Sequence, residues 1–153
     1  MADNVEMSIS IPSDDDGFFL LRCEHCGEFF KLIGDDIESD VIFEVSCPAC
    51  GLTSESFVTD DVINLAMAKV KNYALDMVYD AFKEMERKSK NKYLKIKAGN
   101  KPEHEAENPI RSGIEALELA YFSCCGKKAK IKPLLKFTGC YCPCCGVKNY
   151  EVE

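Results

Sequence analysis

The sequence has no run of about 18 apolar residues, so we expect none of its segments to cross a membrane. Residues 1–13 have neither a basic start nor an apolar core, which argues against a secretory signal peptide. Histidine occurs only twice, at His25 and His104, and we expect both side chains to be exposed rather than to bind metal. The sequence also lacks a Ser/His/Asp series and a phosphate-binding glycine loop. These absences predict a protein that is not an enzyme.

Cysteine, in contrast, occurs ten times in 153 residues. Ten cysteines in a secreted chain would predict a disulfide framework, but this sequence shows no sign of secretion and carries Cys-x-x-Cys pairs. We therefore expect metal-bound thiolates in a reducing, cytoplasmic compartment. Hydrophobic residues make up 46% of the chain, which is enough for a folded core.

Two Cys-x-x-Cys pairs, separated by twenty residues, lie in the N-terminal half, and a glycine follows each pair. Their cysteines are Cys23, Cys26, Cys47 and Cys50. This spacing is typical of a structural zinc site with four thiolate ligands. Four thiolates leave no open position for water or substrate, so the zinc would stabilise the fold and would not catalyse a reaction. A redox Cys-x-x-Cys motif is the alternative, but two matched pairs favour a metal.

The C-terminal segment repeats this pattern with one change. Cys125 and Gly126 correspond to Cys26 and Gly27, and sixteen residues separate Cys125 from Cys142, the first cysteine of the next pair. Cys23, however, corresponds to Phe122. The pattern predicts a second zinc site with three clear ligands, which are Cys125, Cys142 and Cys145.

The fourth ligand of the second site has two candidates. Cys124 comes from the turn that has lost its first cysteine, and we rank it ahead of Cys140. Cys140 stands two residues before Cys142, so the two would share a face of a strand. Cys144 corresponds to Ala49 of the first repeat, and we interpret it as a free thiol. The alternative is that this half has lost its metal and keeps only a hairpin.

We expect an α+β fold in which a long amphipathic helix connects two small β zinc ribbons, the second of them divergent. The short apolar segments 29–33, 41–45 and 52–58 are rich in aromatic and β-branched residues and predict strands. The expected order is an acidic tail at 1–17, the first ribbon at 18–58, the helix at 59–90, a connector at 91–120 and the second ribbon at 121–153. Within the connector, 93–97 predicts a short strand, and 114–122 fits either a strand or a helix.

The helix carries apolar residues at steps of three and four, which form one face. These residues are Ile63, Met67, Val70, Ala74, Met77, Ala81 and Met85. This face from Ile63 to Met85 could cover the ribbon strands, which is the commoner outcome, or pair with a second copy in a homodimer.

Charge is divided unevenly along the chain, whose formal net charge is −7. Residues 1–61 contain 15 acidic and two basic side chains, whereas residues 62–153 contain 11 acidic and 17 basic ones. Lysines interleaved with tyrosine and phenylalanine can neutralise phosphates and stack on bases. We therefore predict nucleic-acid binding by Lys90, Lys92, Lys95, Lys97, Lys127, Lys128 and Lys130.

The same charge distribution fits two alternatives. The acidic N-terminal ribbon could dock a protein partner, as a subunit or an inhibitor of a larger complex. The two halves could also simply attract each other. A scarcity of arginine argues against sequence-specific base contacts in any case.

The pattern Cys23-x-x-Cys26-Gly27 followed by Cys47-Pro48-x-Cys50-Gly51 resembles the zinc-ribbon superfamily. The specific part of this resemblance covers 18–58, and 121–150 matches more loosely because its first ligand is displaced. The resemblance implies a fold and a bound zinc ion, with nucleic-acid or protein binding as the usual role. It implies no particular partner.

Overall fold

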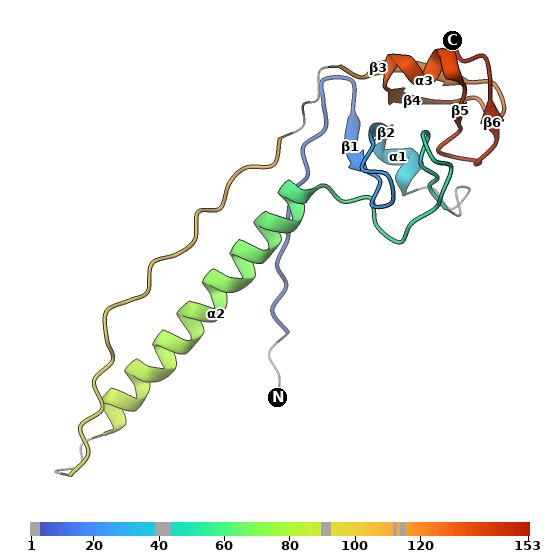
Figure 1. Ribbon diagram of the computed structural model, residues 1–153. Helices are drawn as coiled ribbons and strands as arrows, with labels where there is room; N and C mark the ends of the chain where they lie inside the picture. The colour runs from blue at the N-terminus through green and yellow to red at the C-terminus, as the bar shows by residue number, and fades with distance from the viewer. Residues whose placement is uncertain (1–3, 39–43, 90–92, 112, 114–115) are drawn as a thin grey trace. The chain divides into compact units, whose positions relative to one another are not determined.

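The computed structural model describes residues 4–38, 44–89, 93–111, 113 and 116–153 (Figure 1). The chain forms two compact units, which we describe separately. The sheet unit comprises residues 1–60 and 110–153, and the helix unit comprises residues 61–109. Strands and a long helix are both present, so the predicted α+β class is confirmed. None of the helices in the described ranges is both long and apolar enough to span a membrane.

Two β-hairpins join into one antiparallel sheet with the strand order β1-β2-β4-β3. The first hairpin consists of β1 (Phe18–Arg22) and β2 (Phe29–Ile33). The second consists of β3 (Glu118–Phe122) and β4 (Lys127–Ile131). Each hairpin turns through a cysteine-containing segment, so the sheet fixes the start of both candidate sites.

The repeat seen in the sequence is also a repeat of structure. A short helix follows each hairpin: α1 (Gly34–Ile37) follows the first and α3 (Pro133–Thr138) follows the second. Lys31 and Lys130 stand four residues after Gly27 and Gly126, and the two lysines pair directly across β2 and β4. The two halves are therefore related by an approximate two-fold axis that passes between these lysines.

The second cysteine turns of the two halves also contact each other reciprocally. The Ser46 N–H donates to the Pro143 carbonyl at 2.8 Å, and the Tyr141 N–H donates to the Pro48 carbonyl at 2.9 Å. These four residues occupy equivalent positions around Cys47 and Cys142. Tyr141 belongs to β5 (Cys140–Tyr141), which pairs with β6 (Lys148–Asn149).

One apolar core serves both hairpins. Its fully buried large side chains are Phe30, Leu32, Phe122 and Ile131, and Phe57 packs edge-on against Phe30 with 5.5 Å between ring centroids. The core also includes Cys23, Cys47, Cys140 and Cys142. Both halves contribute side chains to this one core, so neither half buries its apolar side chains alone.

In the helix unit, α2 (Asp60–Lys88) is the long helix that the sequence predicts at 59–90. A segment that we call the strap, residues 98–109, runs along one side of it. The Asn72 side chain binds the Glu105 backbone twice, and Asp76 pairs with Lys101 and His104 at 3.0 Å each. Ala68 and Asn72 are the buried helix residues.

The predicted apolar face of α2 is not the side that the strap covers. Ile63, Met67, Val70, Met77 and Met85 are all 49–67% exposed. The strap binds the opposite side of α2 through polar groups. That the apolar face covers strands or pairs with a second copy stays a prediction.

The short strands that the sequence predicts are only partly present in the structure. Segment 52–58 is not a strand, because it makes one isolated bridge, Ser46 to Thr53, and the Ser54 and Ser56 hydroxyls then bind nearby backbone groups. The strand predicted at 93–97 is wrong, since the structure pairs this segment with no strand in the described ranges. The alternatives for 114–122 resolve to a strand at β3. Most of the strand predicted at 41–45 lies outside the described residues.

Candidate metal centres

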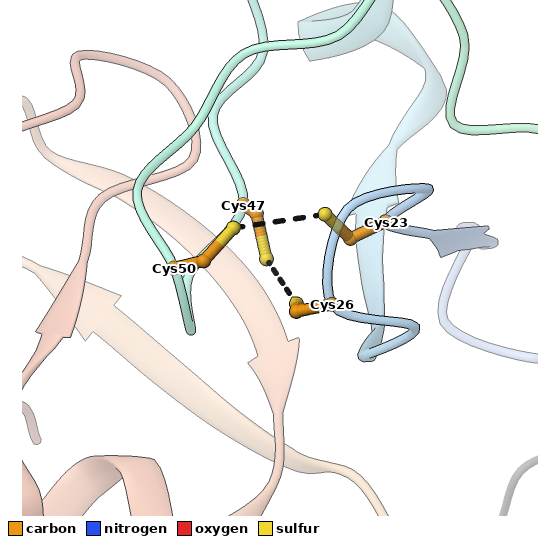
Figure 2. A group of neighbouring side chains, drawn as sticks. All are labelled: Cys23, Cys26, Cys47 and Cys50. Atoms are coloured by element: carbon orange, nitrogen blue, oxygen red, sulfur yellow. Dashed lines mark hydrogen bonds between the residues drawn. The ribbon is translucent and has the colours of Figure 1, made fainter.

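The first cysteine group lies where the β1–β2 turn meets the second cysteine turn of the same half. Its members are Cys23, Cys26, Cys47 and Cys50, and their sulfurs point toward one another (Figure 2). Cys23 Sγ lies 3.7 Å from Cys50 Sγ, and Cys26 Sγ lies 3.6 Å from Cys47 Sγ. All four sulfurs lie within 4.8 Å of one another.

Each turn of this group is closed by a backbone hydrogen bond that glycine makes possible. The Gly27 N–H donates to the Cys23 carbonyl at 2.9 Å, and the Gly51 N–H donates to the Cys47 carbonyl at 2.8 Å. Both glycines have positive φ angles, +74° and +73°, as do their counterparts in the other half. Glycine adopts such φ angles without strain because it has no Cβ atom.

Backbone N–H groups also point at the sulfurs. Burial raises the pKa of the Cys23 thiol, but hydrogen bonds from the N–H groups of Cys26 and His25 outweigh it and lower the pKa to about 7. Burial dominates at Cys47 and raises its pKa far above the ordinary value. A bound cation would favour both thiolates over the thiols.

The second group contains Cys124, Cys125, Cys142 and Cys145. Cys125 Sγ lies 3.4 Å from Cys142 Sγ, and Cys124 Sγ lies 3.4 Å from Cys145 Sγ. The structure therefore brings Cys124, the candidate that the sequence ranked first, into the group. Phe122 occupies the position of Cys23 in the turn and fills the core.

The displaced Cys124 has a side-chain partner of its own. The Asn149 amide donates to Cys124 Sγ at 3.5 Å and belongs to β6, 25 residues further along the chain. Burial raises the pKa of Cys124, but the hydrogen bonds from Cys145 and Asn149 lower it below the ordinary value. Sequence reasoning missed Asn149, because no local motif marks a residue that reaches a sulfur from another strand.

Two cysteines remain outside both groups. Cys140 is buried in the core, and burial together with the nearby Cys142 and Cys124 sulfurs raises its pKa to about 11. Cys144 is half-buried. None of the ten cysteines forms a disulfide bond.

The size and chemistry of both groups fit a metal ion. Thiolate sulfurs at the corners of a tetrahedron, about 2.3 Å from a central zinc, are about 3.8 Å apart. The sulfur pairs here, at 3.4 to 3.7 Å, are close to that spacing and far longer than a disulfide bond of about 2.05 Å. Each group could therefore hold one metal ion.

Acidic residues of the N-terminal half pair with lysines of the second hairpin. Lys127 Nζ lies 2.6 Å from Asp36, and Lys130 Nζ lies 2.8 Å from Asp14 and 2.6 Å from Asp16. The expectation that the two halves attract each other is therefore correct for Lys127 and Lys130.

The other lysines predicted to contact nucleic acid differ from Lys127 and Lys130. Lys95, Lys97 and Lys128 are exposed and form no ion pair with the residues that the structure describes. Lys90 and Lys92 lie outside the described residues.

Neither histidine belongs to a cysteine group. His25 is exposed and its Nε2 lies 3.1 Å from the Thr53 carbonyl, whereas His104 pairs with Asp76. Comparisons of the chain with protein-family models, curated proteins and solved structures find no match.

Proposed function

We propose that each cysteine group binds one zinc ion and that both ions are structural. The observation that carries this proposal is the pair of four-sulfur groups, in which every sulfur lies within 4.8 Å of the other three. Soft thiolate ligands in a tetrahedral arrangement favour zinc. With four protein ligands, neither ion has a position for substrate, so the protein acts by binding and not by catalysis.

The charge of the sheet unit favours a protein partner over nucleic acid. Residues 1–60 and 110–153 contain 18 acidic and nine basic side chains, a net charge of −9. The ion pairs at Lys127 and Lys130 reduce the positive charge that the second hairpin presents. We therefore propose that the sheet unit is a zinc-stabilised adaptor that docks a basic surface of another protein.

Native mass spectrometry of the zinc-loaded chain and two matched serine variants tests the metal assignment. We expect two zinc ions in the wild type, one in Cys124→Ser and two in Cys140→Ser. Both substitutions remove one thiol from the same half of the chain, so only the ligand assignment separates them. A single zinc ion in the wild type, or zinc loss in Cys140→Ser alone, would overturn it.

Affinity capture from a nuclease-treated lysate tests the partner class. We expect the zinc-loaded chain to retain basic proteins that elute as salt increases. The double variant Asp15→Lys, Asp35→Lys should lose them, because it reverses two exposed charges of the sheet unit. The matched control, Asp80→Lys with Glu103→Lys, makes the same charge change in the helix unit and should retain them. Capture that is insensitive to the first variant would contradict the proposal.

A specific observation keeps nucleic-acid binding as the second candidate. Lys148 Nζ lies 5.5 Å from the Tyr141 ring centroid and 5.3 Å from that of Tyr150, while exposed Lys128 faces Tyr121 across the hairpin. Such lysine–aromatic groups can bind single strands. Fluorescence anisotropy with labelled single-stranded DNA and RNA at low salt tests this candidate. Binding should weaken in Lys128→Glu and persist in Lys88→Glu, which changes an exposed lysine of the helix unit. The absence of any binding at low salt would eliminate this candidate.

A further inference from the structure

The two sides of α2 differ in what covers them. Side chains on one side bind the strap, through Asn72 and Asp76. The opposite side carries exposed apolar residues, of which Met67 is the most exposed at 67%. Within the described ranges, the side chains of these residues form no hydrogen bond or ion pair with the strap. The strap thus binds α2 on the side opposite the apolar face.

The exposed side has the spacing of a coiled-coil seam. From Ile63, apolar residues follow at steps of four, three, four, three and four, ending at Ala81. This alternation is the a and d pattern of helices that pack side by side, and it covers about 27 Å of helix. Monomeric proteins rarely expose a continuous apolar strip of this kind. Methionine, with its flexible side chain, is suited to such an interface.

We infer that a second copy of this chain covers this seam, with the two helices antiparallel. The sizes of the residues along the seam favour a second copy as the partner and an antiparallel direction. In a parallel pair, Ala74 would meet the partner's Ala74 and leave a layer without large side chains. In the antiparallel alignment that brings all six seam residues of each helix opposite a seam residue of the other, Val70 packs against the partner's Ala74.

The remaining layers of the antiparallel pair follow the same rule. Ile63 meets the partner's Ala81, and Met67 meets the partner's Met77. Each alanine therefore lies opposite a large side chain, which fills the space that it leaves.

The residues that flank the seam on α2 are compatible with the antiparallel pair. Lys71 lies beside the centre of the seam and would approach the partner's Lys71. Its ammonium group is already paired with Glu105 of the same chain's strap, which offsets the repulsion between like charges. Tyr73, on the other border, is partly exposed and adds aromatic surface.

Sedimentation equilibrium of the full, zinc-loaded chain tests this inference. A single short seam predicts a dimer that dissociates upon dilution between about 100 µM and about 1 µM. Met67→Glu and Val70→Glu should each be monomeric throughout this range, because they place a charge in the seam. Leu94→Glu, an exposed apolar site away from the seam, is the matched control and should dimerise as the wild type does. Circular dichroism should show equal helix content in all four proteins.

A photo-crosslinking benzoylphenylalanine at position 63 tests the direction. The antiparallel pair predicts crosslinks to the partner around Ala81, identified by mass spectrometry of the dimer band. Crosslinks to 59–67 of the partner would overturn the antiparallel arrangement. A monomer at every concentration, a dimer unaffected by Met67→Glu, or crosslinks from position 63 to the same chain's sheet unit would overturn the inference as a whole.

Discussion

At the scale of single residues, Asp14 is notable in the sheet unit because its carboxylate accepts four hydrogen bonds. It lies near the approximate two-fold axis, where one carboxylate oxygen accepts from Lys31 Nζ at 3.0 Å and from Lys130 Nζ at 2.8 Å. The other oxygen accepts from the backbone N–H groups of Phe18 and Asp16. Burial raises the pKa of Asp14, but these hydrogen bonds from Lys130, Phe18 and Lys31 hold it well below its ordinary value.

Replacing this carboxylate should destabilise the sheet unit. Lys31 is only 5% exposed, so Asp14→Asn would leave its ammonium group without a counter-ion in the protein interior. We expect a loss of about 1–3 kcal/mol in the free energy of unfolding, measured by urea denaturation of the zinc-loaded protein at pH 7. Asp15→Asn, which changes an exposed carboxylate, should leave stability unchanged.

The same pair of proteins has a defined pH dependence. The pKa of Asp14 is lowered by folding, so its carboxylate contributes fully above the ordinary pKa of 3.8. The difference in unfolding free energy between wild type and Asp14→Asn should therefore be constant at neutral pH. It should shrink as the pH falls below 3.8 toward the pKa of Asp14 in the folded protein. A difference that increases in acid would contradict this role for Asp14.

At the scale of elements, Gly51 shows how the two halves restrict each other's turns. Its φ angle is +73°, and a Cβ atom there would lie 2.8 Å from the Tyr141 ring of the other half. Gly126 has a similar φ of +70°, but its nearest such neighbour is the Tyr121 hydroxyl at 3.8 Å. Both turns require a positive φ angle, but only at Gly51 is there also no room for a Cβ atom.

Alanine at these two glycines should therefore have unequal effects. Gly126→Ala should cost about 1–2 kcal/mol in unfolding free energy because of backbone strain alone. Gly51→Ala should cost more, since the methyl group also collides with the ring. Urea denaturation of both variants, together with a Gly51→Ala, Tyr141→Ala double-mutant cycle, separates the two causes. Equal costs and no coupling would show that the ring does not restrict this turn.

One amide side chain of α2 binds the backbone of the strap through two hydrogen bonds. Asn72 Oδ1 accepts from the Glu105 N–H at 2.8 Å, and Asn72 Nδ2 donates to the Glu105 carbonyl at 3.0 Å. We expect Asn72→Ala to accelerate hydrogen exchange of the Glu105 amide about tenfold, the effect of losing about 1.4 kcal/mol of local stability. Asn64→Ala, at an exposed helix position, is the matched control. Unchanged exchange would mean that the ion pairs at Asp76 hold the strap without Asn72.

At the scale of the whole molecule, the shared core should couple the two metal sites. Cys23 and Cys47 of the first group and Cys142 of the second belong to one buried cluster with Phe30 and Phe122. Because zinc binding to small β units supplies much of their folding free energy, losing one ion should loosen the core that supports the other.

Cys26→Ser tests this coupling from the first site. We expect it to remove one zinc ion and to weaken retention of the other by about tenfold or more, measured by competition with a chromogenic chelator. Cys144→Ser removes a thiol that belongs to neither group and should leave both affinities unchanged. Equal affinity of the second site in Cys26→Ser and wild type would show that the sites are independent.

The sequence by itself determined the features that depend on residues close together in the chain. The Cys-x-x-Cys spacing with a following glycine defines a turn whose positive φ only glycine adopts without strain, as Gly27 and Gly51 show. The three-and-four spacing from Ile63 onward likewise determined α2, because helical hydrogen bonds join residues four apart.

Only the tertiary structure decided how distant parts of the chain combine. It joined the hairpins through Lys31 and Lys130, brought Cys124 rather than Cys140 to the second group, and paired Lys127 with Asp36. It also left the Ile63–Met85 side of α2 exposed and gave the opposite side to the strap. These outcomes depend on strand register, core packing and ion pairs between residues as many as 116 positions apart, which no local pattern specifies.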